Sequence, residues 1–125
     1  LYLKVEHLIT HNKAPKVSIN ANAKDVIVEI SKNMLGATAV MINNDVVGIV
    51  TDGDIRRMLT NHHEISSLTA KDIMSKNPKT IESNAMVTQA FELMEKHSIS
   101  QLIVTQEGEY VGVIHIHDLI KEGIY

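Results

Sequence analysis

The sequence predicts an α/β (α+β) fold made of two β-α-β-β-α repeats that pack with pseudo-twofold symmetry. The first observation is an internal repeat: the segment NNDVVGIVTDGDIRRML returns as EGEYVGVIHIHDLIKEG. Gly48 corresponds to Gly112, a spacing of 64 residues, and Asp54 corresponds to Asp118 at the same spacing. The second observation is an alternation of short apolar runs with amphipathic stretches. Each copy is small for an independent domain, so we expect the two copies to bury each other's apolar faces.

The first repeat, residues 1–62, shows the expected elements in order. A short helical lead-in precedes Pro15, and an amphipathic pattern that includes Val26 and Ile30 predicts a helix. We expect Gly36 to end this helix as its C-terminal cap. Residues 43–45 (NND) predict a hairpin turn, and an acidic residue opens the last helix. The remaining expected elements are strands at residues 16–19, 37–42 and 46–51 and a helix at residues 52–59.

The second repeat, residues 63–125, follows the same plan after a polar linker. Its lead-in is the segment KDIMSKNPKTI, and residues 107–109 (EGE) predict the hairpin turn. The expected elements are strands at residues 79–81, 101–105 and 110–114 and helices at residues 85–96 and 117–122.

The composition excludes several classes of protein. The net charge of −3 leaves no basic field for nucleic acid or anionic lipid, and no apolar run is long enough to span a membrane. Without cysteine the chain has neither disulfides nor thiolate zinc sites, so we expect a cytoplasmic protein. The chain begins without methionine, and we expect it to be part of a longer protein.

The core must be aliphatic, because aromatic residues make up only 3% of the chain. We expect the methionines at helical or apolar positions to fill gaps in this core, with a contact face between modules as the alternative. These methionines are Met34, Met74, Met86 and Met94.

The chemistry is concentrated where a strand runs into a helix, at GIVTDGDIRR. Backbone N–H groups and the positive end of the helix dipole favour an anion there. The Thr51 hydroxyl can donate to a phosphate, the Asp54 carboxylate can accept from two sugar hydroxyls, and Arg56 and Arg57 add positive charge. The alternative interpretation is that Thr51 and Asp54 only cap the helix.

A metal site at His115-x-His117 with Asp118 is a weaker hypothesis. On a strand both imidazoles would share one face. We expect a helix to begin near His117 and to send the two rings apart, so we predict no metal site. We also find no arrangement of catalytic residues and expect this chain itself not to be an enzyme.

Over essentially its whole length the sequence resembles a tandem pair of CBS domains, through the strand-to-helix motifs at Gly48 to Asp54 and Gly112 to Asp118 and the lead-in KDIMSKNPKTI. Such pairs bind adenosine nucleotides or related ligands between the repeats and regulate an attached enzyme or transporter. The resemblance places Thr51 on the phosphate position and Asp54 on the ribose position. Besides Arg57, the other candidate ligand contacts that the resemblance implies are Val17, Thr38, Thr80, Gln101, His115, His117 and Asp118. His115 departs from the usual Thr or Ser, which favours ribose binding at Asp118 over phosphate binding at His115.

The strings GIVTDGDIRR and GVIHIHDLI further resemble the C-terminal module of bacterial arabinose-5-phosphate isomerases. In that family a sugar isomerase (SIS) domain precedes the CBS pair, and the enzymes serve Kdo, lipopolysaccharide or capsule synthesis. The resemblance implies no required cofactor, a ligand such as AMP, ATP or CMP-Kdo, and a homodimer or tetramer assembled through the CBS pairs. Two alternatives remain: a CBS pair from a different parent protein, and a purely structural module for oligomerisation.

Overall fold

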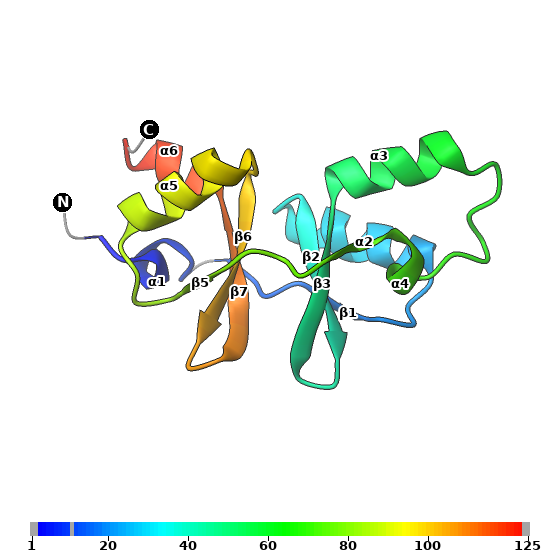
Figure 1. Cartoon of the computed structure of the whole chain (residues 1–125), viewed down its shortest axis with the longest axis horizontal. Coiled ribbons are helices and arrows are strands. Elements are labelled where there is room, and N and C mark those ends of the chain that lie inside the picture. Colours follow the sequence, from blue (N-terminus) through cyan, green and yellow to red (C-terminus); the bar gives the residue numbers. More distant parts are fainter. Residues whose placement is uncertain (1–2, 11, 124–125) are drawn as a thin grey trace. The chain divides into compact units, whose positions relative to one another are not determined.

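The structure is a computed structural model that describes residues 3–10 and 12–123. It contains two β-α-β-β-α repeats, as the sequence predicts (Figure 1). The elements of the first half are α1 (Val5–Leu8), β1 (Lys16–Ser18), α2 (Ala23–Asn33), β2 (Ala37–Ile42), β3 (Asp45–Thr51) and α3 (Asp52–Asn61). Those of the second half are α4 (Ala70–Ile73), β4 (Ser75–Lys76), β5 (Thr80–Glu82), α5 (Val87–His97), β6 (Gln101–Gln106), β7 (Glu109–His115) and α6 (Ile116–Lys121).

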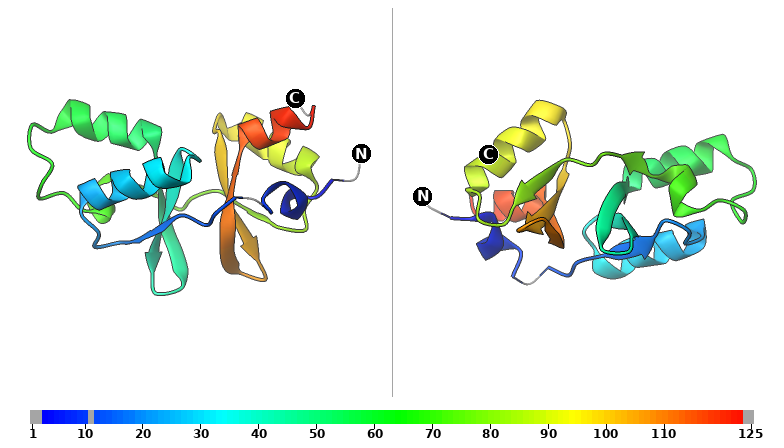
Figure 2. Two further views of the ribbon diagram at one scale, coloured as in Figure 1. Left: turned by 180° about the vertical axis from the view of Figure 1, so that it is seen from behind. Right: turned by 60° about the horizontal axis from the view of Figure 1, so that its bottom comes forward.

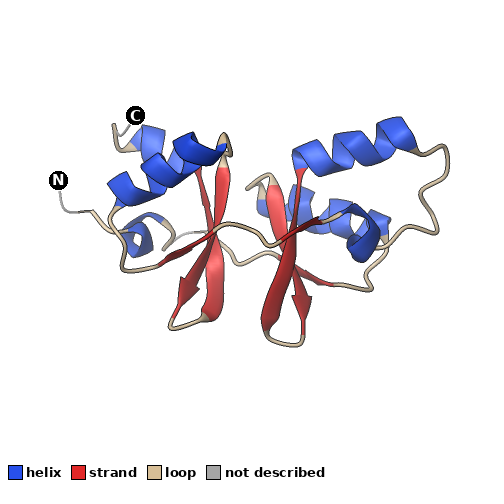
Figure 3. Ribbon diagram, in the orientation of Figure 1, coloured by secondary structure: helices blue, strands red, loops and turns tan. Residues whose placement is uncertain are grey.

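The chain divides into two compact units, which are described separately. Unit 2 comprises Pro15–Pro78 and holds a four-stranded sheet in the order β1-β2-β3-β4. Strand β1 runs parallel to β2, and the other pairs are antiparallel. Helices cover one face of this sheet (Figure 3). The core between the layers contains the fully buried side chains of Val26, Val40 and Val50, so the aliphatic core that the composition predicts is confirmed here.

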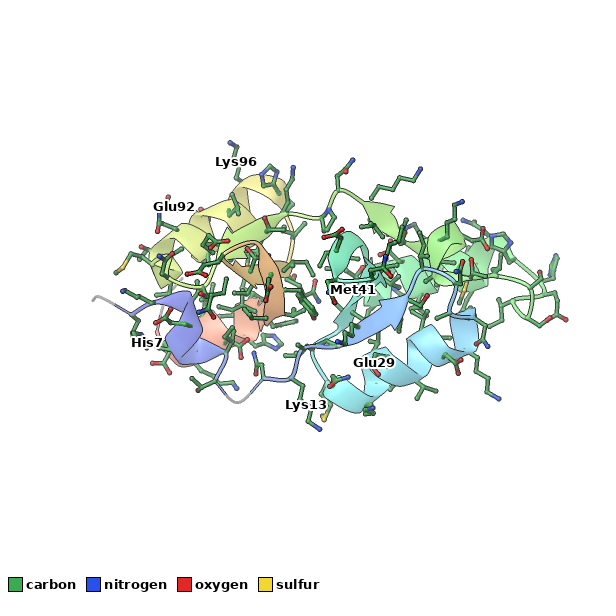
Figure 4. All side chains as sticks on the ribbon, turned by 90° about the horizontal axis from the view of Figure 1, so that it is seen from below. His7, Lys13, Glu29, Met41, Glu92 and Lys96 are labelled. Carbon is green, nitrogen blue, oxygen red and sulfur yellow. The ribbon has the colours of Figure 1, made fainter. Side chains whose placement is uncertain are left out.

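Unit 1 comprises Leu1–Ala14 and Lys79–Tyr125, with a three-stranded sheet in the order β5-β6-β7. Its core includes the fully buried Leu102, Ile114 and Leu119. The polar face of α5 carries Glu92 and Lys96, which point away from the unit (Figure 4). Each unit has a register shift at the same place in its hairpin, after Val40 in one and after Val104 in the other. The repeat is therefore conserved down to an irregularity in strand pairing.

The lead-in helices are exchanged between the repeats. Helix α1 belongs by sequence to the first repeat but lies with α5 and α6, while α4 belongs to the second repeat and lies with α2 and α3 (Figure 2). Backbone hydrogen bonds hold α1 in place, from Val5 to Ala85 and from Val87 to Leu3.

The corresponding bonds hold α4, from Ala70 to Ala21 and from Ala23 to Leu68. Each compact unit thus contains pieces of both halves of the sequence. The repeat boundary between residues 62 and 63 stays a sequence-based prediction.

One prediction about helix α2 is wrong. The helix ends at Asn33, and Met34, with φ of 58°, is the left-handed C-cap in place of Gly36. The cap N–H donates to the carbonyl of Ile30. Met34 is also 88% exposed, which corrects the expectation that it fills the core, whereas Met94 is 1% exposed and does so. Of the other two, Met74 packs against the core of unit 2 and Met86 is half-buried.

Candidate functional site

The junction of β3 and α3 carries the strongest candidate site. Thr51 is the N-cap of α3 and Asp54 is its third helical residue. The two form a reciprocal capping box: the Thr51 backbone N–H donates to Asp54 Oδ2 over 2.9 Å, and the Asp54 N–H donates to Thr51 Oγ1 over 3.4 Å. This arrangement satisfies backbone donors that the first turn of a helix otherwise leaves unpaired. Both residues therefore cap the helix, and their role in ligand binding stays a prediction.

Asp54 is a buried carboxylate with several donors. Its side chain is 5% exposed, and Oδ2 also accepts from the Thr51 hydroxyl over 3.2 Å. The other oxygen, Oδ1, accepts from the Ser75 hydroxyl over 3.1 Å and from the Arg57 guanidinium, with which it forms an ion pair. A buried charge needs such partners to offset its lost hydration. The site residues of α3 are therefore coupled directly to β4.

Gly53 leaves space above the first turn of α3. A Cβ atom built there would lie 3.5 Å from Thr51 Oγ1, 3.6 Å from Arg57 Nη1 and 3.7 Å from Arg56 Nη2. A hydroxyl and two guanidinium groups thus converge on one point at the positive end of a helix of ten residues. This combination suits an anion with several oxygens.

A pocket of about 300 Å³ lies beside Asp54 within unit 2. Its lining includes Asp54, Arg57, Asp72, Met74 and Ser75. Asp72 is held in a second capping box, where the Thr69 backbone N–H and hydroxyl both donate to its Oδ2. These bonds lower the pKa of Asp72 below its usual value. Asp72 therefore contributes a negative charge to the pocket wall at neutral pH.

Unit 1 repeats the junction with a different cap. His115 is the N-cap of α6, and its Nδ1 accepts from the backbone N–H of His117 over 3.0 Å. The His115 N–H donates to Asp118 Oδ2 over 2.8 Å, as Thr51 does to Asp54. The ring centroids of the two histidines are 4.5 Å apart. The expectation that the helix start separates the rings is wrong, because the His115 side chain caps α6 and its Nδ1 accepts from the His117 N–H, which holds its ring beside that of His117.

Two residues at these junctions are absent from the predicted set. Ser75 binds Asp54, and Asn12 binds Asp118, with Asn12 Nδ2 lying 3.1 Å from Asp118 Oδ2. Both follow an exchanged lead-in helix closely in sequence. A local pattern cannot reveal them, because the bonds span 21 and 106 positions. The sequence does place a polar residue shortly after each lead-in helix, but it does not indicate which carboxylate that residue binds.

The remaining predicted contacts come from the strands. Thr38 on β2 is fully buried, and its hydroxyl donates to the Ala39 carbonyl over 3.2 Å. Val17 on β1 lines a different pocket of about 450 Å³, so the structure does not bring it into the pocket beside Asp54. Gln101 on β6 is the direct strand partner of His115, while Thr80 on β5 is exposed. Unit 2 therefore holds five of the predicted residues and unit 1 the other five: Val17, Thr38, Thr51, Asp54 and Arg57 in the former, and Thr80, Gln101, His115, His117 and Asp118 in the latter.

The described residues also bear on metal binding and on membrane insertion. Among residues 3–10 and 12–123, no group of three or more His, Cys, Asp or Glu side chains is placed to hold a metal ion. Within the same residues no helix has both the length and the apolar character needed to cross a bilayer.

Known proteins share both the sequence and the fold. Over 123 residues the chain is 41% identical to the arabinose 5-phosphate isomerase KdsD of Francisella tularensis, a match that covers 97% of this chain and 38% of the relative. The Escherichia coli protein of the same name is 29% identical over 126 residues, with 99% and 38% covered. The chain therefore spans less than two fifths of the length of these relatives.

Solved structures match nearly the whole chain. A CBS domain protein from Pyrobaculum aerophilum complexed with AMP has a TM-score of 0.84 and 26% identity, and the match covers 94% of this chain and 90% of that one. A CBS-domain protein from Burkholderia ambifaria, described as a putative signal-transduction protein, has a TM-score of 0.88 and 24% identity, with 98% and 94% covered. The CBS domain family itself matches residues 5–61 and 70–125. The chain is thus a pair of CBS domains and belongs to this family.

Proposed function

We propose that this chain is the ligand-binding regulatory module of an arabinose-5-phosphate isomerase and senses a nucleotide or nucleotide-sugar. The observation that carries the binding part is the relative complexed with AMP, which is 26% identical over nearly the whole chain. The 41% identity to KdsD supports the choice of parent enzyme. The effector is an adenine nucleotide, AMP or ATP, or the activated sugar CMP-Kdo.

The phosphate and the sugar of such a ligand have matching groups at the α3 junction. The Thr51 hydroxyl and the two guanidinium groups around Gly53 suit the phosphate. The Asp54 carboxylate has two acceptor oxygens, which suit the two hydroxyls of a ribose once a donor that they bind within the protein leaves. In unit 1, Asp118 repeats the carboxylate, and His115 stands where a hydroxyl stands in unit 2. The two junctions therefore differ in their phosphate-binding groups.

The regulated activity lies in the rest of the parent protein, which we propose carries an N-terminal SIS catalytic domain. A ligand that binds one state of the CBS pair more tightly biases the neighbouring domain, with a coupling of typically ~1–3 kcal/mol. We propose a cytoplasmic enzyme that assembles as a dimer or tetramer through its CBS pairs.

Binding is tested by thermal unfolding and calorimetric titration of this chain with AMP, ADP, ATP, CMP and CMP-Kdo. A ligand at ~100 times its dissociation constant adds about 2.7 kcal/mol to the free energy of unfolding, a shift of several degrees. Asp54→Asn should abolish the shift. Asp52→Asn is the matched control, since it removes the same charge from the same helical turn at an exposed position. Equal shifts in the two variants would place the ligand elsewhere, and no shift with any ligand would reject nucleotide sensing by this set.

A purely structural role in assembly is the second candidate. It is favoured by the complete use of the Asp54 carboxylate within the protein. It predicts that removing the CBS pair from the parent enzyme changes its mass in sedimentation experiments while no nucleotide alters its rate. A nucleotide-dependent rate would decide for the regulatory role.

A further inference from the structure

We infer that Arg57 determines ligand specificity, because it holds the Asp54 carboxylate until a phosphate group draws it away. The site would then select ligands that present a phosphate and a pair of sugar hydroxyls together. This inference rests on the proposed function, because it concerns the same junction. It assigns to Arg57 a role beyond adding charge to phosphate binding.

The acceptor positions of the Asp54 carboxylate are all used within the protein. A carboxylate offers about four acceptor positions. Here four donors use them: the Thr51 N–H and hydroxyl at Oδ2, and the Ser75 hydroxyl and Arg57 guanidinium at Oδ1. Two ribose hydroxyls therefore cannot bind unless at least one of these donors leaves.

Arg57 is the donor that leaves the Asp54 carboxylate most easily. The Thr51 donors belong to the capping box and are fixed by the start of α3. The Ser75 hydroxyl comes from β4, which is anchored to β3 at Ile49. The Arg57 side chain, by contrast, is 66% exposed, and its guanidinium lies at the end of a long flexible stem. An exposed partner of this kind regains hydration when it leaves, so its release costs least.

The Arg57 guanidinium also reaches the space at Gly53 that suits a phosphate. While Nη2 of Arg57 binds Asp54, Nη1 of the same group lies 3.6 Å from the Cβ position of Gly53, beside Arg56. One planar group thus reaches both the carboxylate and the space that suits a phosphate. A phosphate there offers charged acceptor oxygens in bidentate geometry, which compete with the carboxylate for the guanidinium. Phosphate binding and release of Asp54 are therefore two results of a single side-chain movement.

The test compares AMP with adenosine, which share the sugar and differ in the phosphate. Dissociation constants are measured by calorimetry for the unaltered chain and for Arg57→Met and Arg56→Met. We expect the unaltered chain to bind AMP at least ~30-fold more tightly than adenosine. In Arg57→Met, AMP binding should weaken ~10-fold or more while adenosine binding tightens ~3-fold or more. In Arg56→Met, AMP binding should weaken without any gain for adenosine.

The gain for adenosine is the decisive readout, because a merely structural or charge effect would not produce it. Arg57→Lys should keep part of the AMP affinity, since it retains the charge without the planar fork. Circular dichroism spectra and melting temperatures check that the variants fold. If AMP binds the unaltered chain but adenosine does not gain in Arg57→Met, the inference is wrong and the proposed function stands. If neither AMP nor adenosine binds the unaltered chain or any variant, the inference is wrong, and the proposed function is then decided by ATP and CMP-Kdo.

Discussion

The Ser75 hydroxyl donates a hydrogen bond to Asp54 over 3.1 Å, although 21 positions separate the two residues. Asn12 does the same for Asp118 in unit 1, also over 3.1 Å. In both units the donor follows a lead-in helix that belongs, by sequence, to the other repeat. The carboxylate at each helix start is therefore positioned by a segment of distant sequence.

Replacing Ser75 with Ala should lower the free energy of unfolding by about 1 kcal/mol, because a buried charged acceptor loses one donor. Urea denaturation measures the effect. Ser67→Ala is the control, since Ser67 is an exposed loop residue of the same type. Equal effects of the two substitutions would show that the bond to Asp54 contributes nothing to stability.

Gly48 and Gly112 occupy equivalent places in the repeat but should respond differently to substitution by Ala. A Cβ at Gly48 would lie 2.5 Å from Met74 Sδ and 3.0 Å from the Ser75 carbonyl oxygen, because β4 runs close beside β3. At Gly112 the first neighbour, Ile9 Cδ1, is 3.6 Å away, an ordinary contact.

We expect Gly48→Ala to destabilise the chain by ~1–3 kcal/mol through overpacking, and Gly112→Ala to change it by less than about 1 kcal/mol. Thermal or urea unfolding of the two variants gives the comparison directly. A larger loss at Gly112 would contradict the close approach of β4 to β3.

Gly53→Ala should separate stability from ligand binding. The added methyl group meets its neighbours at 3.5–3.7 Å, so it fits, and Ala favours a helix over Gly by up to ~1 kcal/mol. The same methyl group occupies the space between Thr51 Oγ1 and the two guanidinium groups. The variant should therefore melt at a higher temperature and bind AMP several-fold more weakly. Unchanged AMP affinity would place the phosphate away from Gly53.

Asp72 should make stability depend on pH in the acid range. Its pKa is lowered by hydrogen bonds from the Thr69 backbone N–H and hydroxyl, so the folded state favours the carboxylate. This contribution is complete above the pKa of the unfolded chain, about 3.9, and is lost as the pH falls through the lower folded value.

Asp72→Asn should accordingly destabilise the chain at pH 6 and do so less near pH 2, because the carboxyl becomes protonated as the pH falls. Urea denaturation at both pH values tests this, and NMR titration of the Asp72 carboxyl carbon reads the pKa directly. Titration at or above pH 4 would contradict the capping box at Thr69.

Met34→Gly should stabilise the chain by ~0.5–1 kcal/mol. Met34 adopts a left-handed conformation, which a side chain with a Cβ disfavours, and it is 88% exposed, so little packing is lost. Met94→Gly is the opposite case and should be strongly destabilising, because Met94 is 1% exposed within a helix. A fall in the melting temperature of Met34→Gly would show that its side chain makes a stabilising contact.

The sequence predicts well whatever depends on neighbouring residues. Thr51 and Asp54 are three positions apart, so their capping box follows from local chemistry. The left-handed cap at Met34 escapes prediction because Gly36, two positions later, is the more typical residue for it. The contact between the His115 and His117 rings escapes prediction because it depends on the His115 side chain capping the helix, a role that Ser, Thr, Asp or Asn fills more often.

What the sequence could not show is the exchange of lead-in helices. Val5 and Ala70 are equivalent in the repeat, and nothing near either residue indicates which half it will pack against. The bonds of Ser75 and Asn12 follow from that exchange and are hidden for the same reason. Distant pairings of this kind are fixed by tertiary packing rather than by local preference.

The exchange of the lead-in helices also orders events on the ribosome. Unit 2 is one continuous stretch, Pro15–Pro78, and all of its pieces are available as soon as that stretch has emerged. Unit 1 joins Leu1–Ala14 to Lys79–Tyr125. The apolar side chain of Val5 therefore cannot pack into its core until residues 79–125 have been synthesised. Within this stretch of the chain, the segment before Pro15 is thus synthesised well before its partners, and its apolar side chains stay uncovered until those partners are made.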